Sequence, residues 1–303
     1  MNPFLEVFTK NIIPIFIVAA VGFFLRKRMG LSTKVLSSLT FYALSPALAF
    51  SALVNNQLNN GEFLQIAAFA VISSFAMGLI GLVLGTLLRL SRSGIVAVIL
   101  VLMFANGGNF GLTLNELRYG EEGLARAIVF YVMSTIILFT FGVFLSSMGR
   151  SSARESLIRL VKLPAVYAVV LAVVVYTFNI NVPVPLMRGI EITGAGAIPV
   201  MLIVLGMQIA DVNSIEGVWV SIPASLARLL IAPFIAVLVA GLIGLSGLSR
   251  STSIIEASMP TAVFTTILAT EFNVRPRLVT STVAISTLLS AITLPLVITL
   301  LEL

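Results

Sequence analysis

The sequence predicts an all-α integral membrane protein in which ten transmembrane helices form two inverted repeats of five. Hydrophobic residues make up 59% of the 303 residues and charged residues only 10%, and the mean hydropathy is +1.13. This composition is typical of a polytopic membrane protein rather than of a soluble enzyme. Two long apolar runs are interrupted by Gly or Pro at matching places in the two halves, a pattern that indicates a transporter built from internal repeats.

Apolar runs of membrane-spanning length follow one another along almost the whole chain, with short connections between them. The first five spans and their flanks form an expected first repeat, residues 1–150, and the rest form a second, residues 151–303. Because five is an odd number, the second repeat enters the membrane from the opposite side. The expected spans are residues 4–25, 33–54, 63–88, 94–117, 123–147, 161–178, 184–209, 217–245, 252–271 and 277–301.

The ninth span is interrupted at Pro260, in the segment from Ala257 to Ala262. Proline has no N–H and clashes with the preceding turn, so it breaks or kinks a helix. The freed backbone groups are tolerated at membrane depth only where protein, water or a ligand satisfies them. The small polar neighbours Ser258 and Thr261 suit such a place. An ordinary proline kink without a ligand is the alternative interpretation of this segment.

The fourth span is interrupted in the same way by the glycine-rich segment from Phe104 to Gly111. A shift of 153 positions places Gly107 on Pro260, and the same shift places Pro46 on Pro199. One offset that matches several helix-breaking positions indicates a repeat that covers nearly the whole chain.

The first interruption carries two amide side chains, Asn106 and Asn109. An amide donates and accepts hydrogen bonds without a charge penalty, so it suits either recognition of a carboxylate or capping of a broken helix. If the two interrupted helices cross, their second halves point their N-termini toward the crossing, and the positive helix ends favour an anion. We therefore expect a small organic anion as substrate. Nearby aromatic residues that could stack on a planar substrate are Phe104, Phe110 and Phe264.

Few ionisable residues lie at membrane depth, and each is a functional candidate. Glu256 lies one turn before Pro260 and is the candidate site for a coupling cation or a proton; a position near the water interface is the alternative. Glu191 is expected at the interface. Arg228 could bind substrate, bind a backbone carbonyl or extend to the membrane surface.

The composition also excludes several classes of protein. The chain has neither Cys nor His, so thiolate and imidazole chemistry is absent and no enzyme activity, metal site or cofactor is expected. The net charge of +6 lies mostly in the connections between spans, where it sets orientation in the lipid bilayer and requires no nucleic-acid partner.

The distribution of Lys and Arg predicts the orientation of the spans. Alternate connections carry twelve basic residues on one side and five on the other, so both termini are expected outside the cytoplasm. The twelve are Arg26, Lys27, Arg28, Lys34, Arg89, Arg92, Arg150, Arg154, Arg159, Lys162, Arg275 and Arg277, and the five are Lys10, Arg118, Arg126, Arg188 and Arg250.

The second interruption and the chain that follows it resemble a known family. The segments Met259-Pro260, Ala269 to Pro276 and Leu294-Pro295-Leu296 are similar to the last two spans of auxin efflux carrier (PIN-like) transporters of bacterial type. The segment from Asn106 to Gly111, followed by Leu112-Thr113-Leu114, is similar to that family's fourth span. One departure is Thr113, near which the family often has Pro, so that the break here would rest on glycines.

This resemblance implies a layout and a mechanism. Spans 1, 2, 6 and 7 would form a scaffold, through which a homodimer often forms, and spans 3–5 and 8–10 would form a transport domain with elevator-type movement. The implied substrates are carboxylates or auxin-like acids. Residues at positions that match the family's site would line the substrate site in this chain: Asn106, Gly107, Gly108, Asn109, Ser258, Pro260 and Thr261.

The leading hypothesis is therefore a multi-pass secondary transporter of an organic anion in a plasma membrane, the bacterial inner membrane. One alternative is a cation/proton antiporter, in which Glu256 would replace the usual buried Asp. Another is a membrane sensor that binds ligand without transporting it. The sequence leaves open the identity of the substrate, the direction of transport and the coupling ion.

Overall fold

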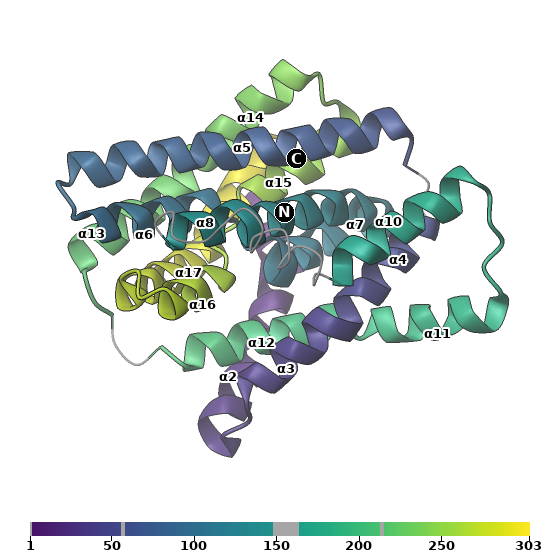
Figure 1. Ribbon diagram of the computed structural model, residues 1–303, viewed down its shortest axis with the longest axis horizontal. Coiled ribbons are helices and arrows are strands. Elements are labelled where there is room, and N and C mark those ends of the chain that lie inside the picture. Colours follow the sequence, from purple (N-terminus) through teal and green to yellow (C-terminus); the bar gives the residue numbers. More distant parts are fainter. Residues whose placement is uncertain (1, 56–57, 148–163, 213–214) are drawn as a thin grey trace.

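The computed structural model describes residues 2–55, 58–147, 164–212 and 215–303, and these fold into a bundle of helices of unequal length (Figure 1). Several helices contain a single π-helical turn, which is labelled η. In the first half the elements are α1 (Pro3–Val7), η1 (Phe8–Ile12), α2 (Ile13–Met29), α3 (Thr33–Leu39), η2 (Thr40–Leu44), α4 (Ser45–Asn55), α5 (Asn60–Leu87), α6 (Arg92–Met103), η3 (Gly107–Gly111), α7 (Leu112–Ile137), η4 (Leu138–Gly142) and α8 (Val143–Ser146).

The second half also consists of helices of unequal length. Its elements are α10 (Pro164–Thr177), α11 (Val184–Ala195), α12 (Ala197–Ala210), α13 (Val218–Leu226), η5 (Ala227–Ile231), α14 (Ala232–Ile243), α15 (Gly247–Ala257), α16 (Phe264–Glu271) and α17 (Pro276–Leu300).

Within the described residues, seven helical stretches are long and apolar enough to cross a membrane. They are Pro3–Met29, Thr33–Asn55, Gly61–Leu87, Gly107–Ser146, Val184–Ala210, Val218–Ile243 and Pro276–Leu300. Two shorter apolar helices are α6 and α10. The prediction of an all-helical membrane protein is confirmed, whereas ten spans in inverted repeats stay a prediction.

Seven stretches are found where ten spans are expected for three local reasons, the first of which is that the expected sixth span corresponds to α10, a helix of only 14 residues. The stretch Gly107–Ser146 contains Gly120, whose φ of 65° and ψ of −156° are not helical, so two helices meet there at a kink. This residue lies between the expected fourth and fifth spans. The expected ninth span is divided into α15 and α16, each too short to cross a bilayer alone.

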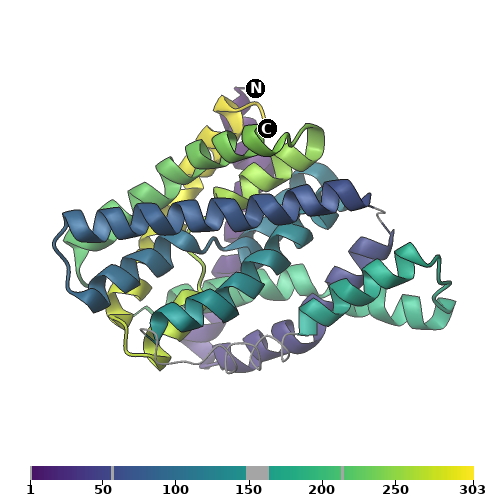
Figure 2. The same ribbon diagram turned by 45° about the horizontal axis from the view of Figure 1, so that its top comes forward.

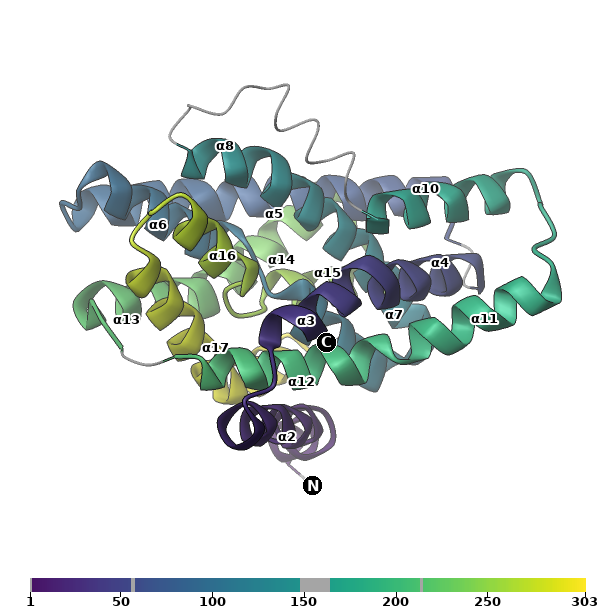
Figure 3. The ribbon, with the colours of Figure 1, turned by 60° about the horizontal axis from the view of Figure 1, so that its bottom comes forward.

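The helices pack as two groups. In one group α12 packs along α2 and also contacts α3, while α10 and α11 pack against α4. In the other group α5 packs on α6, α7 and α14, α15 packs on α7 and α14, and α17 packs on α13 and α16. Figure 3 shows α4, α10 and α11 on one side of the molecule and α6, α13, α16 and α17 on the other. The long helix α5 runs alongside α6 in both Figure 1 and Figure 2.

Polar contacts between connecting segments divide these segments into two sets. One set is joined by Asp211, which accepts hydrogen bonds from Arg26 Nε at 2.5 Å and from Thr33 Oγ1 at 2.8 Å. In the same set Arg277 pairs with Glu216 at 2.7 Å. These segments are the ones for which the basic residues predict a cytoplasmic location.

The other set is joined by Arg126, whose Nε lies 2.7 Å from Glu62 Oε1 and 3.1 Å from Ser249 Oγ. Arg118 donates to the backbone carbonyl of Leu303, so the end of the chain lies with this set. These segments carry the few basic residues that the prediction places outside.

Within the first group, the backbones of α2 and α12 are in direct contact. A Cβ atom at Gly206 of α12 would lie 1.7 Å from the carbonyl oxygen of Ala19 in α2, and one at Gly22 would lie 2.0 Å from that of Ile203. Only glycine at these positions lets the two backbones approach so closely. The pair α2–α12 therefore forms a tightly packed element.

We predict that Gly206→Ala lowers the thermal midpoint of the purified protein, because the added methyl group must push α2 and α12 apart. Overpacking of this kind costs about 1–3 kcal/mol. The matched control is Gly241→Ala in α14, where an added Cβ meets nothing within 4 Å. Equal midpoints for the two variants, measured in the same detergent, would contradict the close packing.

Candidate functional site

The two interrupted helices meet at their interruptions. After α6 the chain is extended at Phe104, and the N–H of Asn106 donates to the carbonyl of Pro260 at 2.8 Å. The N–H of Ala262 donates to the carbonyl of Phe104, also at 2.8 Å. These two bonds form an isolated antiparallel bridge between Ala105 and Thr261. The freed backbone groups that the sequence predicts at the two breaks thus satisfy one another in part.

The C-terminal ends of the first half-helices are held by Arg228 of η5, which is only 2% exposed. Its guanidinium donates to the carbonyls of Leu102 at 2.8 Å, Ala257 at 2.6 Å and Met259 at 2.9 Å. Carbonyls at a helix C-terminus carry partial negative charge, so a cation there is stabilising. Of the three roles considered for Arg228 from the sequence, the structure shows binding to backbone carbonyls.

The N-terminal ends of the second half-helices face a small pocket of about 60 Å³, called here the crossing pocket. The interrupted helices contribute Phe104 to Asn109 on one side and Ala262 to Phe264 on the other. The first backbone bond of η3 runs from the N–H of Gly111 to the carbonyl of Asn106, so the amides between them precede the helical ladder. The side chains that complete the lining are Phe41, Tyr131, Ser134, Thr135, Leu138 and Phe139.

The residues expected to bind substrate in the first interruption all line the crossing pocket: Asn106, Gly107, Gly108 and Asn109. Asn106 is 4% exposed, and its Nδ2 finds no hydrogen-bond partner among the described residues. Asn109 Nδ2 lies 3.4 Å from Oε1 of Gln208 in α12. This contact joins the two groups of helices.

The residues expected in the second interruption have a different place. Ser258 Oγ donates to the carbonyl of Ile254 at 2.6 Å, and Thr261 Oγ1 donates to the carbonyl of Val101 at 2.9 Å. Pro260 contributes the carbonyl that binds Asn106. Thr261 and Pro260 therefore join the two interrupted helices, Ser258 bonds within its own helix, and none of the three is among the residues that line the pocket.

Glu256 is fully buried beside the other face of the first interruption. Its Oε1 accepts a hydrogen bond from Asn115 Nδ2 at 3.0 Å, and its Oε2 has no partner among the described residues. A Cβ atom built on Gly107 or on Gly111 would lie 2.5 Å from a carboxyl oxygen of Glu256. The two glycines therefore make the space that the carboxyl occupies.

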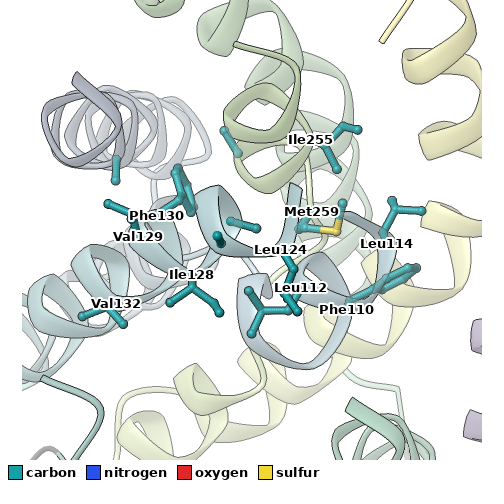
Figure 4. Close-up of a cluster of buried hydrophobic side chains, with 14 of the residues drawn as sticks. Phe110, Leu112, Leu114, Leu124, Ile128, Val129, Phe130, Val132, Ile255 and Met259 are labelled. Carbon is teal, nitrogen blue, oxygen red and sulfur yellow. The ribbon is translucent and has the colours of Figure 1, made fainter. Parts of the chain in front are cut away.

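Asn115 was not predicted from the sequence, although a signal for it exists. Gly107, Gly111 and Asn115 are spaced four residues apart and so lie on one face of a helix. Apolar side chains enclose this region: Figure 4 shows Met259 among Leu112, Leu114 and Leu124.

A larger cavity of about 740 Å³ adjoins the crossing pocket. It lies between α3 and η2 on one side, α12 on another, and α16 with α17. Lys34, Gln208 and Asp211 line it, so it lies at the predicted cytoplasmic side. Four further residues line both spaces: Phe41, Phe139, Val263 and Phe264.

Three phenylalanines stand between the cavity and the pocket. The ring centroids of Phe41 and Phe139 are 5.8 Å apart, those of Phe41 and Phe264 are 5.8 Å apart, and those of Phe139 and Phe264 are 5.6 Å apart. Of the three aromatic residues noted in the sequence, Phe104 and Phe264 line the crossing pocket. Phe110 is buried and packs edge-on against Phe16.

We predict that Gly111→Ala destabilises the protein because the new methyl group would meet both carboxyl oxygens of Glu256. The expected cost is about 1–3 kcal/mol, read as a lowered thermal midpoint. Glu256→Ala in the same chain should relieve this clash, so the two changes combine non-additively. As a control, Gly189→Ala, where nothing lies within 4 Å, should be additive with Glu256→Ala. Additive effects for the Gly111 pair would argue against the contact.

Comparison with known proteins identifies the family. A family model described as membrane transport protein matches residues 7–155 and 146–298, which together cover most of the chain. An uncharacterized transporter of the archaeon Methanocaldococcus jannaschii is 26% identical over 296 residues, which cover 93% of this chain and 95% of the relative. An uncharacterized transporter of Methanothermobacter thermautotrophicus is 27% identical over 305 residues, which cover 95% of this chain and 96% of the relative.

These matches confirm the family that the two interruptions resembled, and they agree with the expectation that the chain is not an enzyme. The buried crossing of interrupted helices is thus found in a multi-pass membrane protein whose relatives are named as transporters. The chain belongs to the auxin efflux carrier family of membrane transport proteins.

Proposed function

We propose that this transporter is a secondary carrier of a small organic anion, which binds in the crossing pocket. The observation that supports this proposal best is the arrangement of charge around the crossing. Arg228 neutralises the negative ends of α6 and α15, while residues at the start of η3 and α16 line the pocket. The partial positive charge of these helix N-termini favours an anionic group in the pocket.

The side chains of the pocket fit a carboxylate. Asn106 Nδ2 is buried without a partner among the described residues, and a carboxylate oxygen would give it one. The crossing pocket has room for a carboxylate, and the adjoining cavity has room for the rest of a small organic acid. Threonine and serine hydroxyls together with aromatic rings line this cavity, a lining compatible with a partly apolar acid.

The packing of the helices supports an elevator-type movement. The group of α2–α4 and α10–α12 would be the scaffold, and the group of α5–α8 and α13–α17 would move with the substrate. The pair Arg26–Asp211 joins helices of the scaffold, whereas Arg126–Glu62 and Arg277–Glu216 join helices of the moving group. At the boundary, Asn109 and Gln208 make a long, neutral hydrogen bond that a sliding motion can exchange easily.

The same reasoning gives the orientation in a plasma membrane such as the bacterial inner membrane. The contacts of Asp211 and Arg277 gather segments that we place in the cytoplasm, and those of Arg126 and Arg118 gather segments that we place outside, with both chain ends. The large cavity then opens toward the cytoplasm. Dimerisation through the scaffold accords with the family resemblance.

We predict that Asn106→Ala weakens carboxylate binding roughly 10- to 100-fold, the usual cost of losing a hydrogen bond to a charged group. Binding of acetate, succinate and phenylacetate would be measured by thermal shift on the purified protein and by uptake into liposomes. Asn55→Ala is the matched control, because Asn55 bonds to Glu191 at the exposed end of α4, away from the crossing. A wild-type protein that neither binds nor moves any of these probes would exclude the proposed function.

A cation/proton antiporter is the second candidate, because Glu256 is fully buried and has one carboxyl oxygen without a partner among the described residues. In that case a pH gradient would drive exchange of Na⁺ or K⁺ in liposomes, and Glu256→Gln would abolish it. Glu191→Gln, at the half-buried residue that accepts a hydrogen bond from Asn55, should leave exchange unchanged. Under the organic-anion proposal, the wild-type protein shows no such exchange in the absence of a carboxylate.

A further inference from the structure

One turn of helix separates the crossing pocket from the carboxyl of Glu256. Gly107 lines the pocket, and a Cβ built on it would lie 2.5 Å from Glu256 Oε2. A bound anion and the Glu256 carboxyl would therefore face the same N-terminal turn from opposite sides. The helix that begins there continues from η3 into α7 as far as Gly120.

The charge available at this turn is limited. A helix N-terminus carries roughly half an elementary positive charge, which can balance part of one carboxylate but not two. In a medium of low dielectric constant, two carboxylates so close together repel each other strongly. The N-terminal turn that begins at Gly107 is therefore better matched by one negative charge beside it than by two.

No cationic side chain in the described residues pairs with Glu256. From α7 it is faced by the amide of Asn115 and by Tyr131, whose ring lies against Gly108, and from η3 by glycines. Arg228 directs its bonds to backbone carbonyls. Of the other helices packed on α15, α14 has no titratable residue, and α5 has only Glu62, which pairs with Arg126 beside Ser249 in the first turn of α15.

We propose that an anion enters the crossing pocket together with a proton that binds to the carboxylate of Glu256. This inference rests on the proposed function and names its coupling ion. The proton adds to one carboxylate oxygen of Glu256 as the substrate anion arrives, and it leaves to water when the anion is released on the other side. For a monovalent anion the empty and the loaded moving groups then carry the same net charge. Transport is electroneutral and driven by a pH gradient rather than by membrane potential.

The test measures proton uptake on binding, with acetate, succinate and phenylacetate as probes in weakly buffered solution. Between about pH 7 and 8.5 the free probes are ionised, so a proton taken up on binding is gained by the complex, and the Glu256→Gln protein shows whether Glu256 holds it. We expect about one proton per bound anion at the upper end of this range. We also expect binding to weaken by about tenfold for each pH unit above the ionisation of Glu256 in the empty protein.

Glu256→Gln imitates the protonated acid in shape and in neutral charge. It should bind the probes with little dependence on pH and without proton uptake, and Glu191→Gln should behave as the wild type. A wild-type protein that binds a probe without taking up protons overturns the coupling, even if the Glu256→Gln protein does not fold. So does a Glu256→Gln protein that keeps the pH dependence of the wild type. If no probe binds to the wild type at any pH, the proposed organic-anion function itself fails. This outcome differs from binding without proton uptake, which contradicts only the coupling.

Discussion

Two backbone hydrogen bonds at membrane depth, one between Asn106 and Pro260 and one between Ala262 and Phe104, position every other part of the site. A hydrocarbon environment offers no water to an interrupted helix, so each break must find its partners in protein. Here each break supplies partners for the other. The pairing brings four helix ends to one place, with two C-termini on Arg228 and two N-termini at the crossing pocket.

The buried Arg228 shows how such a place becomes polar without becoming unstable. An isolated cation in the membrane is costly, but three carbonyl oxygens at 2.6–2.9 Å replace its water, and two helix ends supply opposite partial charge. The small polar residues have a related role. Thr261 donates to the carbonyl of Val101 near the end of α6, and Ser258 donates to the carbonyl of Ile254 in its own helix, so both hydroxyl groups bind backbone rather than line the pocket.

The sequence was sufficient for features that depend on local chemistry. Gly107 and Pro260 mark the breaks because glycine and proline interrupt helices, and Glu256 stands out because carboxylates are rare in apolar runs. The partners of these residues depend on the folded chain instead. Gln208 lies 99 residues from Asn109, and the phenylalanine cluster draws its members from three helices. The number of spans is hard to read for a related reason: an interrupted helix has halves too short to resemble a span.

If the proposed movement takes place, the phenylalanine cluster would link it to access to the pocket. Phe41 belongs to the group of helices proposed as the scaffold, whereas Phe139 and Phe264 belong to the group proposed to move. A displacement of that group along the membrane normal would move the rings of Phe139 and Phe264 past the ring of Phe41. The contacts among the three rings beside the pocket would then open as a direct result of the movement. The protein would then need no separate hinge to admit solvent, because the same translation that carries the cargo also breaks the aromatic barrier.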